Sequence, residues 1–270
     1  MITSRSNPYV KSARALRQRK YRQQSGLFLV EGIRQVADAL ESSFVVERLF
    51  YAPEMLNSAF AQQLIAQAQT RGVDCLSVSA DVFASLAEKE NPQGILAVAR
   101  WPQHTLAGYS LPEDAAWSVA LVAPQDPGNI GTILRTMDAV GAQPLFLLDG
   151  GADPTHPSVV RASLGALFWI PVISCTFDEF VIWCRRHSYT VYGTSAHGQD
   201  TLQTLRQAQP PGVLLLGSER TGLAEARQAV CHALIRLPMQ GHVSSLNLGV
   251  SAGIFLYALY EGQSSDINAG

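Results

Sequence analysis

The sequence predicts an α/β protein with two domains. Short apolar segments alternate with helical segments along the whole chain, which is the pattern of strands joined by crossover helices. The 270 residues are enough for two domains of ordinary size, each with its own core. Residues 101–117 separate the two halves and contain two prolines, a glycine and no periodicity. We therefore expect domains at residues 1–104 and 117–270, joined by a linker at residues 105–116.

The first half predicts one basic helix over residues 9–24, ended by Ser25-Gly26, followed by a small α/β domain. The strands expected in this domain are residues 26–32, 45–52, 74–79 and 93–100, and the helices are residues 33–40, 58–72 and 81–89.

The second half predicts a parallel sheet, because its strand segments are continuous apolar runs of the kind that helices cover on both faces. The strands expected here are residues 117–124, 144–150, 190–195, 212–219 and 232–238. The expected helices are residues 127–142, 156–172, 177–188, 222–230 and 244–261, of which the second runs into a further apolar segment.

Composition and cysteine spacing favour a reduced protein of the cytosol that holds no structural metal. The chain is 47% hydrophobic and 16% charged, and no apolar run reaches the length of about 18 residues that suggests a membrane span. Its first residues lack the apolar stretch of a secretory signal, which predicts a cytoplasmic location. The four cysteines form no CxxC pair, and none has a histidine at zinc-ligand spacing; they are Cys75, Cys175, Cys184 and Cys231.

Charge is distributed unevenly along the chain. Residues 1–22 hold seven of the twenty basic residues and no acidic one, so the other 248 residues carry thirteen basic and twenty-two acidic groups, a balance of −9. A basic arm on an acidic body suits a polyanionic partner such as RNA, although a solvated amino-terminal helix would look the same. The cations that we expect to bind RNA are Arg14, Arg17, Lys20 and Arg22.

Polar residues follow three strands of the second half, where open parallel sheets bind their ligands. In the first segment, residues 123–142, Asn129 stands at the expected cap position of a helix. Arg135 lies one turn after Gly131, so its guanidinium is unobstructed and could hold a phosphate. The alternative is that Asn129 is only a cap and that Arg135 pairs with Asp138.

In the second segment, residues 212–226, a strand ends at Gly217 and a helix is expected from Thr221-Gly222. Gly217 would let the backbone approach a planar ligand, with Glu219 at the crevice. The alternative is that Glu219 only stabilises the amino terminus of the helix.

The third segment, residues 237–255, predicts an irregular loop and a closing helix capped by Ser244 or Ser245. Small residues recur every four positions at Ser245, Gly249 and Gly253, which leaves room for another backbone to approach. Asn247 is polar in an apolar helix and needs a partner if it is buried. The alternative is a core helix with ordinary capping residues.

Together the three segments resemble the SpoU (TrmH) branch of the SPOUT RNA methyltransferases. Asn129 and Arg135 match the family's N-x5-R, residues 217–223 match G-[SN]-E-x-x-G-L, and residues 237–247 match I-P-M-x-G-x3-S-L-N. RASLGALF at residues 161–168 resembles the segment RxSxGAxF. The departures from the pattern remove no polar functional group. Arg220 stands where glycine is common, Leu237 replaces isoleucine, and Leu248-Gly249 and Ser251 vary the small-residue pattern after Asn247.

The amino-terminal half, from ITSRSNPYVK to QGILAV, resembles the substrate-binding domain attached to many members, which is related in fold to kink-turn-binding ribosomal proteins. The resemblance implies a trefoil-knotted carboxyl-terminal domain and a homodimer to which the helices at 127–142 and 244–261 contribute. It also implies methyl transfer from S-adenosylmethionine to a ribose 2′-hydroxyl of RNA, with ribosomal RNA favoured over tRNA.

The resemblance further implies the residues of the site. The expected catalytic residues are Arg135, Asn129, Glu219, Ser245 and Asn247. The expected cofactor-binding residues are Gly217, Leu237, Leu246, Thr194 and Met239. Because a guanidinium stays protonated, we expect Arg135 to hold a phosphate and stabilise the developing alkoxide rather than to accept the proton. Two other activities remain open, methylation of a base nitrogen and a non-catalytic role in RNA binding or ribosome assembly.

Overall fold

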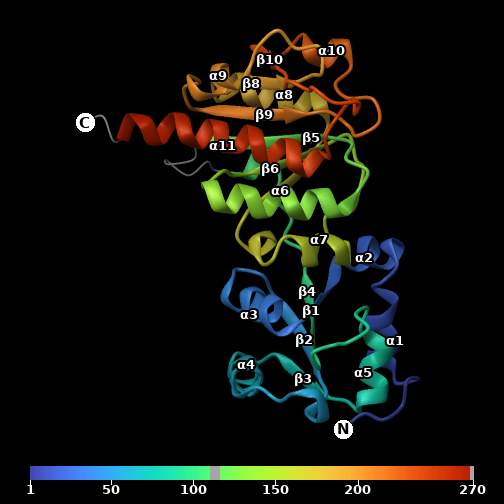
Figure 1. Ribbon diagram of the computed structural model, residues 1–270. Helices are drawn as coiled ribbons and strands as arrows, with labels where there is room; N and C mark the ends of the chain where they lie inside the picture. Colours follow the sequence, from blue (N-terminus) through green and yellow to red (C-terminus); the bar gives the residue numbers. More distant parts are fainter. Residues whose placement is uncertain (110–115, 268–270) are drawn as a thin grey trace. The chain divides into compact units, whose positions relative to one another are not determined.

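The structure is a computed structural model that describes residues 1–109 and 116–267 (Figure 1). It forms two compact units, one of Met1–Pro102 with Thr155–Phe168 and one of Gln103–Pro154 with Trp169–Gly270. Thr155–Phe168 thus packs in the first unit although it follows the expected linker. Residues 110–115 of that linker lie outside the described residues. None of the described helices is both long and apolar enough to cross a membrane.

The first unit is a four-stranded mixed sheet flanked by helices. The strand order is β1-β4-β2-β3, in which β4 is antiparallel to both neighbours and β2 is parallel to β3. Its strands are β1 (Leu27–Glu31), β2 (Val46–Tyr51), β3 (Asp74–Ser77) and β4 (Ile95–Arg100). Its helices are α1 (Pro8–Ala15), α2 (Arg19–Ser25), α3 (Ile33–Glu41), α4 (Ala59–Thr70), α5 (Ala80–Leu86) and α7 (Pro157–Ala162), with 3-10 turns at Pro53–Met55 and Ala166–Phe168.

The single basic helix expected over residues 9–24 is wrong, because the chain breaks between α1 and α2. Asn7 caps α1, whose second residue donates to its side chain, and α1 ends at Ala15. The guanidinium of Arg22 then donates to the carbonyl oxygens of Leu16 and Arg17, at 2.9 and 2.8 Å. These bonds satisfy the two carbonyl groups at the break from within the protein.

The second unit is an entirely parallel six-stranded sheet in the order β10-β8-β9-β5-β6-β7, as the apolar strand segments predicted. Its strands are β5 (Trp117–Val122), β6 (Leu145–Leu148), β7 (Val172–Cys175), β8 (Thr190–Thr194), β9 (Gly212–Leu216) and β10 (Ala233–Ile235). Its helices are α6 (Pro127–Val140), α8 (Phe177–Arg186), α9 (Leu202–Arg206), α10 (Glu225–Gln228) and α11 (Leu248–Ile267), with a 3-10 turn at Leu106–Gly108.

Three expectations about this half are corrected. The helix expected at residues 156–172 ends at Ala162 and is followed by a 3-10 turn at Ala166–Phe168, and the further apolar segment into which it was expected to run is the strand β7. The helix expected at residues 222–230 is the single turn α10. The closing helix starts at Leu248 rather than at residue 244, because Asn247 and not a serine caps it.

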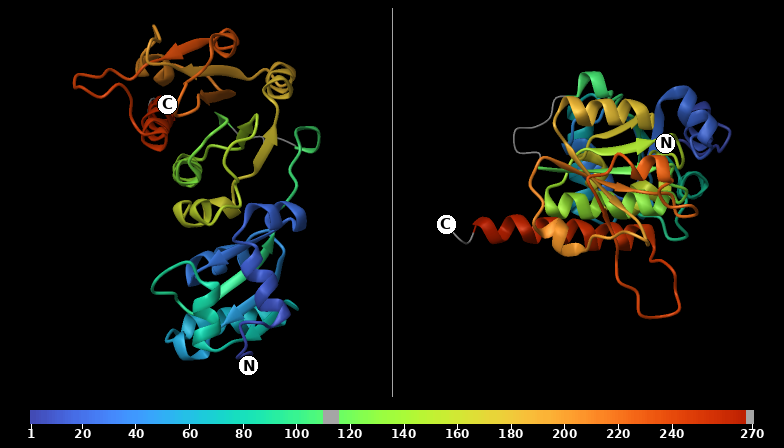
Figure 2. Two further views of the ribbon diagram at one scale, coloured as in Figure 1. Left: turned by 90° about the vertical axis from the view of Figure 1, so that its right-hand side faces the viewer. Right: turned by 90° about the horizontal axis from the view of Figure 1, so that it is seen from above.

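Helices cover both faces of the parallel sheet (Figure 2). α8 packs Phe180 and Trp183 against Phe146 of β6, with ring centroids 5.3 and 5.0 Å apart. α6 and α11 lie side by side on the other face (Figure 1). At their crossing, Gly249 of α11 lies against Thr132 of α6, where a Cβ would come within 3.0 Å of the Thr132 methyl group.

Candidate active site

Strand order explains why segments far apart in sequence meet. β10, β8, β9 and β5 are consecutive neighbours and run in the same direction. Their carboxyl ends therefore lie along one edge of the sheet, where ligands bind in open parallel sheets (Figure 1). Three of the expected site residues, Thr194, Gly217 and Leu237, lie at or directly after the ends of β8, β9 and β10.

The carboxylate of Glu219 joins the segment after β9 to the segment after β5. It accepts a hydrogen bond from the side-chain amide of Asn129 at 3.0 Å. It also accepts from the backbone N–H groups of Gln125 at 3.0 Å and Asp126 at 3.3 Å. Two of the predicted catalytic residues are thus in direct contact, and the alternative that Glu219 only stabilises the helix after it does not hold.

The expectation that Asn129 caps its helix is wrong. Asp126 is the cap, since its carboxylate accepts from the N–H of Gly128 at 2.8 Å. Pro127 takes the first helical position, where its missing N–H costs nothing. Asn129 then lies inside the first turn with only 5% of its surface exposed, and its buried amide needs the partner that Glu219 provides.

The hydrogen bonds to Glu219 determine its protonation. Burial raises the pKa of this carboxyl, but the donors Asn129, Gln125 and Asp126 together outweigh burial, and the pKa lies below its ordinary value of 4.5. Glu219 is therefore ionised at neutral pH and is a poor proton acceptor. Its position suits it to orient Asn129 and the loop after β5.

Arg135 lies on α6 with its side chain exposed. Within residues 1–109 and 116–267, its guanidinium has no hydrogen bond or ion pair, and the alternative pairing with Asp138 is not formed. A cation without a protein partner is available to an anionic ligand.

Asn247 and Ser245 precede α11. The side-chain oxygen of Asn247 accepts from the N–H groups of Gly249 at 2.9 Å and Val250 at 3.3 Å, so Asn247 is the cap that we expected Ser244 or Ser245 to be. Asn247 is exposed, and among the described residues its amide nitrogen has no partner. Ser245 lies in the exposed loop, and no hydrogen bond of the described residues joins its hydroxyl to the other expected site residues.

The turn after β9 has a shape that requires glycine. The chain folds back so closely that a Cβ at position 217 would lie 2.1 Å from the carbonyl carbon of Gly222. Ser218 and Thr221 close the turn with a hydroxyl contact of 2.8 Å, and Gly222 has a φ of +62°. Position 217 must therefore be glycine for the backbone of Gly222 to pack against it. This requirement is separate from any close approach of a ligand.

Three of the expected cofactor residues, Leu237, Met239 and Leu246, lie in an exposed loop or directly before it. Residues 238–247 are all exposed, and Met239 and Leu246 each expose 38% of their surface. Within the described part of the chain, no backbone hydrogen bond is formed by Leu237 or by residues 238–246. Apolar side chains beside unpaired N–H and C=O groups fit a ligand with a planar ring and a polar edge, such as the adenosine of S-adenosylmethionine.

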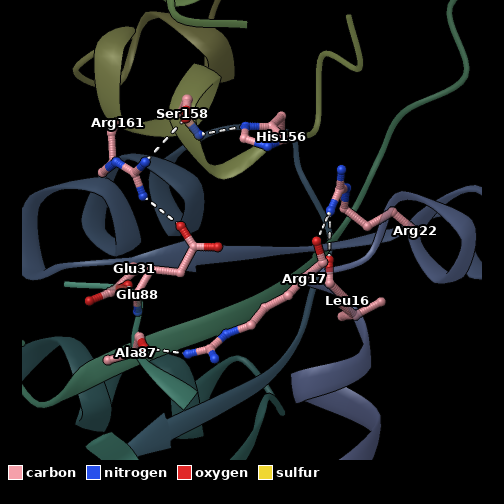
Figure 3. Close-up of polar contacts among 9 residues, drawn as sticks. All are labelled: Leu16, Arg17, Arg22, Glu31, Ala87, Glu88, His156, Ser158 and Arg161. Carbon is pink, nitrogen blue, oxygen red and sulfur yellow. Dashed lines mark hydrogen bonds and ion pairs between the residues drawn. The ribbon is translucent and has the colours of Figure 1, made fainter. Parts of the chain in front are cut away.

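The predicted RNA-binding cations occupy different environments. Arg22 is only 3% exposed, and besides the two carbonyls at the helix break it donates to the Thr155 hydroxyl at 3.2 Å. Arg14 donates to the Arg5 carbonyl and the Ser85 hydroxyl, and Arg17 donates to the carbonyl of Ala87. All three side chains make hydrogen bonds within the first unit (Figure 3 shows those of Arg17 and Arg22), and because Arg22 is buried we no longer expect it to contact phosphate. Lys20 is exposed, as are two further cations that the prediction left out, Lys11 and Arg19.

The cysteines are free thiols, and burial raises the pKa of Cys175 and of Cys184 to about 12. Across residues 1–109 and 116–267, no three His, Cys, Asp or Glu residues are grouped so that they could hold a metal ion.

Sequence reasoning missed Asp126 and an ion pair between Asp149 and Arg227. An acidic residue before Pro-Gly at a helix start is a recognisable cap signal, so Asp126 could have been found. Asp149 follows β6 and Arg227 lies in α10, with 2.6 Å between carboxylate and guanidinium. No local pattern joins positions so far apart in sequence.

Comparison with known proteins assigns both halves of the chain. Residues 116–257 match the SpoU rRNA Methylase family, and residues 7–97 match the MRM3-like substrate binding domain. The chain is 32% identical to the 23S rRNA (guanosine(2553)-2′-O)-methyltransferase RlmP of Bacillus subtilis (strain 168), over 96% of this chain and 98% of that protein. It is 33% identical to a 23S rRNA (uridine(2479)-2′-O)-methyltransferase of Streptomyces viridochromogenes, over 95% of this chain and 90% of that protein.

Among solved structures, the chain is similar to an AdoMet-bound rRNA methyltransferase from Sinorhizobium meliloti. The TM-score is 0.87 at 34% sequence identity, and the match covers 96% of each chain. The resemblance drawn from the three motifs is confirmed by these matches, which extend over nearly the whole sequence. The chain belongs to the SpoU rRNA methylase family.

Proposed function

We propose that this protein transfers a methyl group from S-adenosylmethionine to a ribose 2′-hydroxyl of ribosomal RNA. The observation that carries the proposal is the arrangement at the carboxyl ends of β5 and β9. There Asn129 and Glu219 bind each other, and Arg135 of the same helix as Asn129 has no partner among the described residues. Relatives that match at least 95% of the chain are named as 23S rRNA 2′-O-methyltransferases.

The cofactor supplies a methyl group on a positively charged sulfur. Backbone groups at Gly217, Leu237 and Leu246 would hold it, with Thr194 and Met239 beside it. The neighbour from Sinorhizobium meliloti is an AdoMet-bound enzyme, which supports this assignment. The proposed site follows β8, β9 and β10, where the strand ends are adjacent.

Arg135 would hold the phosphate next to the target ribose and stabilise the negative charge that develops on the 2′-oxygen. A guanidinium is suited to both tasks, since it stays protonated and presents several donors. Glu219 would orient Asn129 rather than accept the ribose proton, because three N–H groups already lower its pKa. Asn247 would add a donor from the start of α11, and Ser245 would reach the nucleotide from the loop before it.

Four finer features belong to the same proposal. We propose a trefoil knot in the carboxyl-terminal part, by the family resemblance. We propose a homodimer through α11, which carries exposed apolar residues on one face. Since ribosomal RNA is the proposed substrate, we place the protein in the cytoplasm. We propose that RNA binds the first unit through Lys11, Arg19 and Lys20, which are exposed and form no ion pair within the described residues.

The test is the replacement Arg135→Ala, assayed with ribosomal RNA from a strain that lacks the gene. Methyl transfer should fall at least tenfold, a loss of about 1.4 kcal/mol or more in transition-state stabilisation. Cofactor affinity measured by calorimetry should stay unchanged, because no expected cofactor contact involves α6.

Digestion of the wild-type product to nucleosides should place the methyl group on ribose. Arg185→Ala is the matched control, since this exposed arginine lies on α8, on the other face of the sheet. An Arg135→Ala variant that retains more than a tenth of the wild-type kcat would refute the assigned role, and a methyl group on a base would refute the reaction.

A further inference from the structure

Arg227 is held on two sides beside the turn at residues 217–223, hereafter the β9 turn, which carries Glu219. Its guanidinium donates to the carboxylate of Asp149 at 2.6 Å and lies over the ring of Phe177, 5.3 Å from the ring centroid. The side chains of Arg227 and Asp149 each expose 30% of their surface, so solvent and salt screen this pair less than a fully exposed one. All residues of this contact belong to the second unit. The proposed reaction gives the pair no role.

The helix that carries Arg227 is bonded directly to the β9 turn. The side-chain amide of Gln228, the next residue of α10, donates to the carbonyl oxygen of Leu223 at 2.7 Å. Leu223 is buried in the core of the second unit. Just before it, the N–H of Gly222 donates to the carbonyl oxygen of Ser218 at 2.9 Å. The place of α10 therefore constrains the end of the turn.

Asp149 connects Arg227 to the loop after β6. It directly follows that strand, and its second carboxylate oxygen accepts from the N–H of Phe177 at 2.9 Å. Further along the same loop, the N–H of Ala152 donates to the carbonyl oxygen of Pro124 at 2.7 Å. A Cβ at Gly151 would lie 2.4 Å from that same oxygen. The loops after β5 and β6 are therefore in direct contact.

The loop after β5 begins in a strained conformation and ends at Glu219. Ala123 has a φ of +43°, which alanine rarely adopts and which persists only where surrounding contacts hold it. Here the N–H of Ala123 donates to the carbonyl oxygen of Leu148 at 2.8 Å. Gln125 and Asp126, further along this loop, donate their N–H groups to Glu219. The contacts thus form a closed ring of the β9 turn, the loops after β5 and β6, and α10.

We propose that Arg227 is a positioning residue, which fixes the place of the Glu219 carboxylate in the active site. Through Asp149 it holds the loop after β6, and this loop holds the loop after β5, whose N–H groups bind Glu219. Through α10 it holds the β9 turn itself. Arg227 touches neither substrate nor cofactor in this scheme. Its effect on rate rests on the proposed methyl transfer, whereas its effect on Glu219 does not.

The experiment compares the full-length wild type with Arg227→Gln and Asp149→Asn, all without cofactor. NMR gives the pKa of Glu219 from its carboxyl carbon shift, and the exchange rates of the Gln125 and Ala152 amides. Both variants should raise the pKa of Glu219 toward its ordinary value, because looser loops present their N–H groups less well. Both amides should exchange about two- to tenfold faster, the range expected for loss of a partly exposed ion pair and its aromatic contact. Amides of the β5–β9 ladder should keep their rates.

The direction of the pKa change separates positioning from a simple change in charge. Loss of the negative charge of Asp149 would by itself lower the pKa of Glu219, and loss of the positive charge of Arg227 would raise it. Positioning predicts a rise in both variants. Arg227→Lys keeps the charge and should restore the wild-type pKa at least in part. The double variant should be no worse than either single one, because both remove the same pair.

Arg206→Gln is the matched control, since it breaks the 3.1 Å ion pair with Glu261 in the same unit, between α9 and α11. It should change neither the pKa of Glu219 nor the exchange rate of Gln125. In the methyl-transfer assay, kcat of Arg227→Gln should fall by about the factor by which amide exchange rises, while the KM for RNA stays within experimental error.

Two results would overturn the inference. If the pKa of Glu219 moves in opposite directions in the two variants and amide exchange is unchanged, Arg227 acts only through its charge. If both variants fold and neither the pKa nor the exchange rates change, Arg227 only stabilises α10. If the wild type transfers no methyl group at all, the proposed function fails, while the pKa and the exchange rates still decide whether Arg227 positions Glu219.

Discussion

In this site a single residue, Glu219, links two segments of the chain by hydrogen bonds. One exposed carboxylate binds a side-chain amide and two backbone N–H groups from the segment after β5. The motif predicts that Glu219 and Asn129 belong to one site, but not that they touch. The contact between Glu219 and Asn129 forms because β9 lies next to β5 in the sheet. The two strands are almost one hundred residues apart in the sequence.

The lowered pKa of Glu219 predicts how the effect of replacing this residue on protein stability depends on pH. In the folded protein the pKa lies below 4.5, so the unfolded chain binds more protons near that pH. The stabilisation from the carboxylate is therefore complete above about pH 5 and is lost as pH falls through the folded pKa. The variant Glu219→Gln cannot ionise, so the difference in unfolding free energy between wild type and variant should be constant near neutrality.

That difference should move in favour of Glu219→Gln as the pH falls below about 4.5. Urea unfolding at a series of pH values measures it, and Glu225→Gln, for a second carboxylate of the same unit, serves as control. A difference that stays constant down to about pH 3 would contradict the assigned hydrogen bonds.

At the scale of elements, strand and helix identities follow from the sequence better than their ends. Apolar runs and their spacing predict the parallel sheet, whereas α1 and α2 were expected as one helix. The apolar segment that forms β7 was noted after the helix expected at residues 156–172 but was not predicted as a strand. Arg22 explains the first failure, since the break between the helices depends on carbonyl contacts from a residue six positions further along. Such a contact leaves no periodic signal.

The crossing of α6 and α11 predicts opposite effects for two glycines of one helix. Alanine is favoured over glycine inside a helix by about 0.5–1 kcal/mol. At Gly253 the nearest atom to a new Cβ is the Thr136 methyl group at 4.0 Å, so Gly253→Ala should gain most of that stabilisation. At Gly249 a Cβ would come within 3.0 Å of Thr132 and 3.2 Å of the capping oxygen of Asn247.

Gly249→Ala should therefore be neutral or destabilising, and the two variants should differ by about 1 kcal/mol in unfolding free energy. Urea denaturation at one fixed protein concentration would measure the difference. Equal stabilisation by both substitutions would mean that the helices are not in close contact at Gly249.

The exposed cations of α1 and α2 predict a salt-dependent affinity for RNA. Each phosphate contact contributes about 0.7–0.9 to the slope of log K against log salt. Replacing Lys11, Arg19 and Lys20 together by glutamine should reduce the slope by about two to three if all three contact phosphate. The methylated nucleotide should stay the same, because phosphate contacts carry no sequence information.

Lys89→Gln is the control for the loss of a cation, since Lys89 lies between Glu88 and Glu90. Filter binding or fluorescence anisotropy across a salt series gives both slopes. If the triple variant keeps the wild-type slope, the basic helices are solvated structure and RNA binds elsewhere.

At the scale of the whole molecule, the sequence predicts two α/β parts. It does not predict that residues 155–168, which follow the linker, pack in the first part. Residues 161–168 carry a motif of the methyltransferase half, and still their buried side chains pack in the first unit. The spacing of apolar residues predicts that side chains such as Val159 and Leu167 are buried. It does not predict against which of the two sheets they pack. Only the arrangement of the folded chain decides that, so the residues that contact the segment, such as Glu88 and Phe44, carried no visible signal.

The exposed face of α11 predicts that the protein forms a homodimer. Val250, Ile254 and Tyr257 recur at helical spacing and expose 52%, 37% and 48% of their surfaces. An apolar stripe on a long helix is unusual on a monomer and is typical of an interface. With a second copy as the partner, the stripe would be buried and the protein would sediment at twice 29.2 kDa.

Ile254→Arg should then convert the dimer to a monomer. Leaving an unpaired charge in an apolar interface costs roughly 3–5 kcal/mol, which weakens association at least about a hundredfold. Ile182→Arg is the matched control, because Ile182 is 65% exposed on α8, on the opposite face of the sheet. Sedimentation velocity over a range of concentrations separates the outcomes: a wild type that is monomeric throughout, or an Ile254→Arg variant that dimerises as tightly as Ile182→Arg, would exclude α11 as the interface between copies.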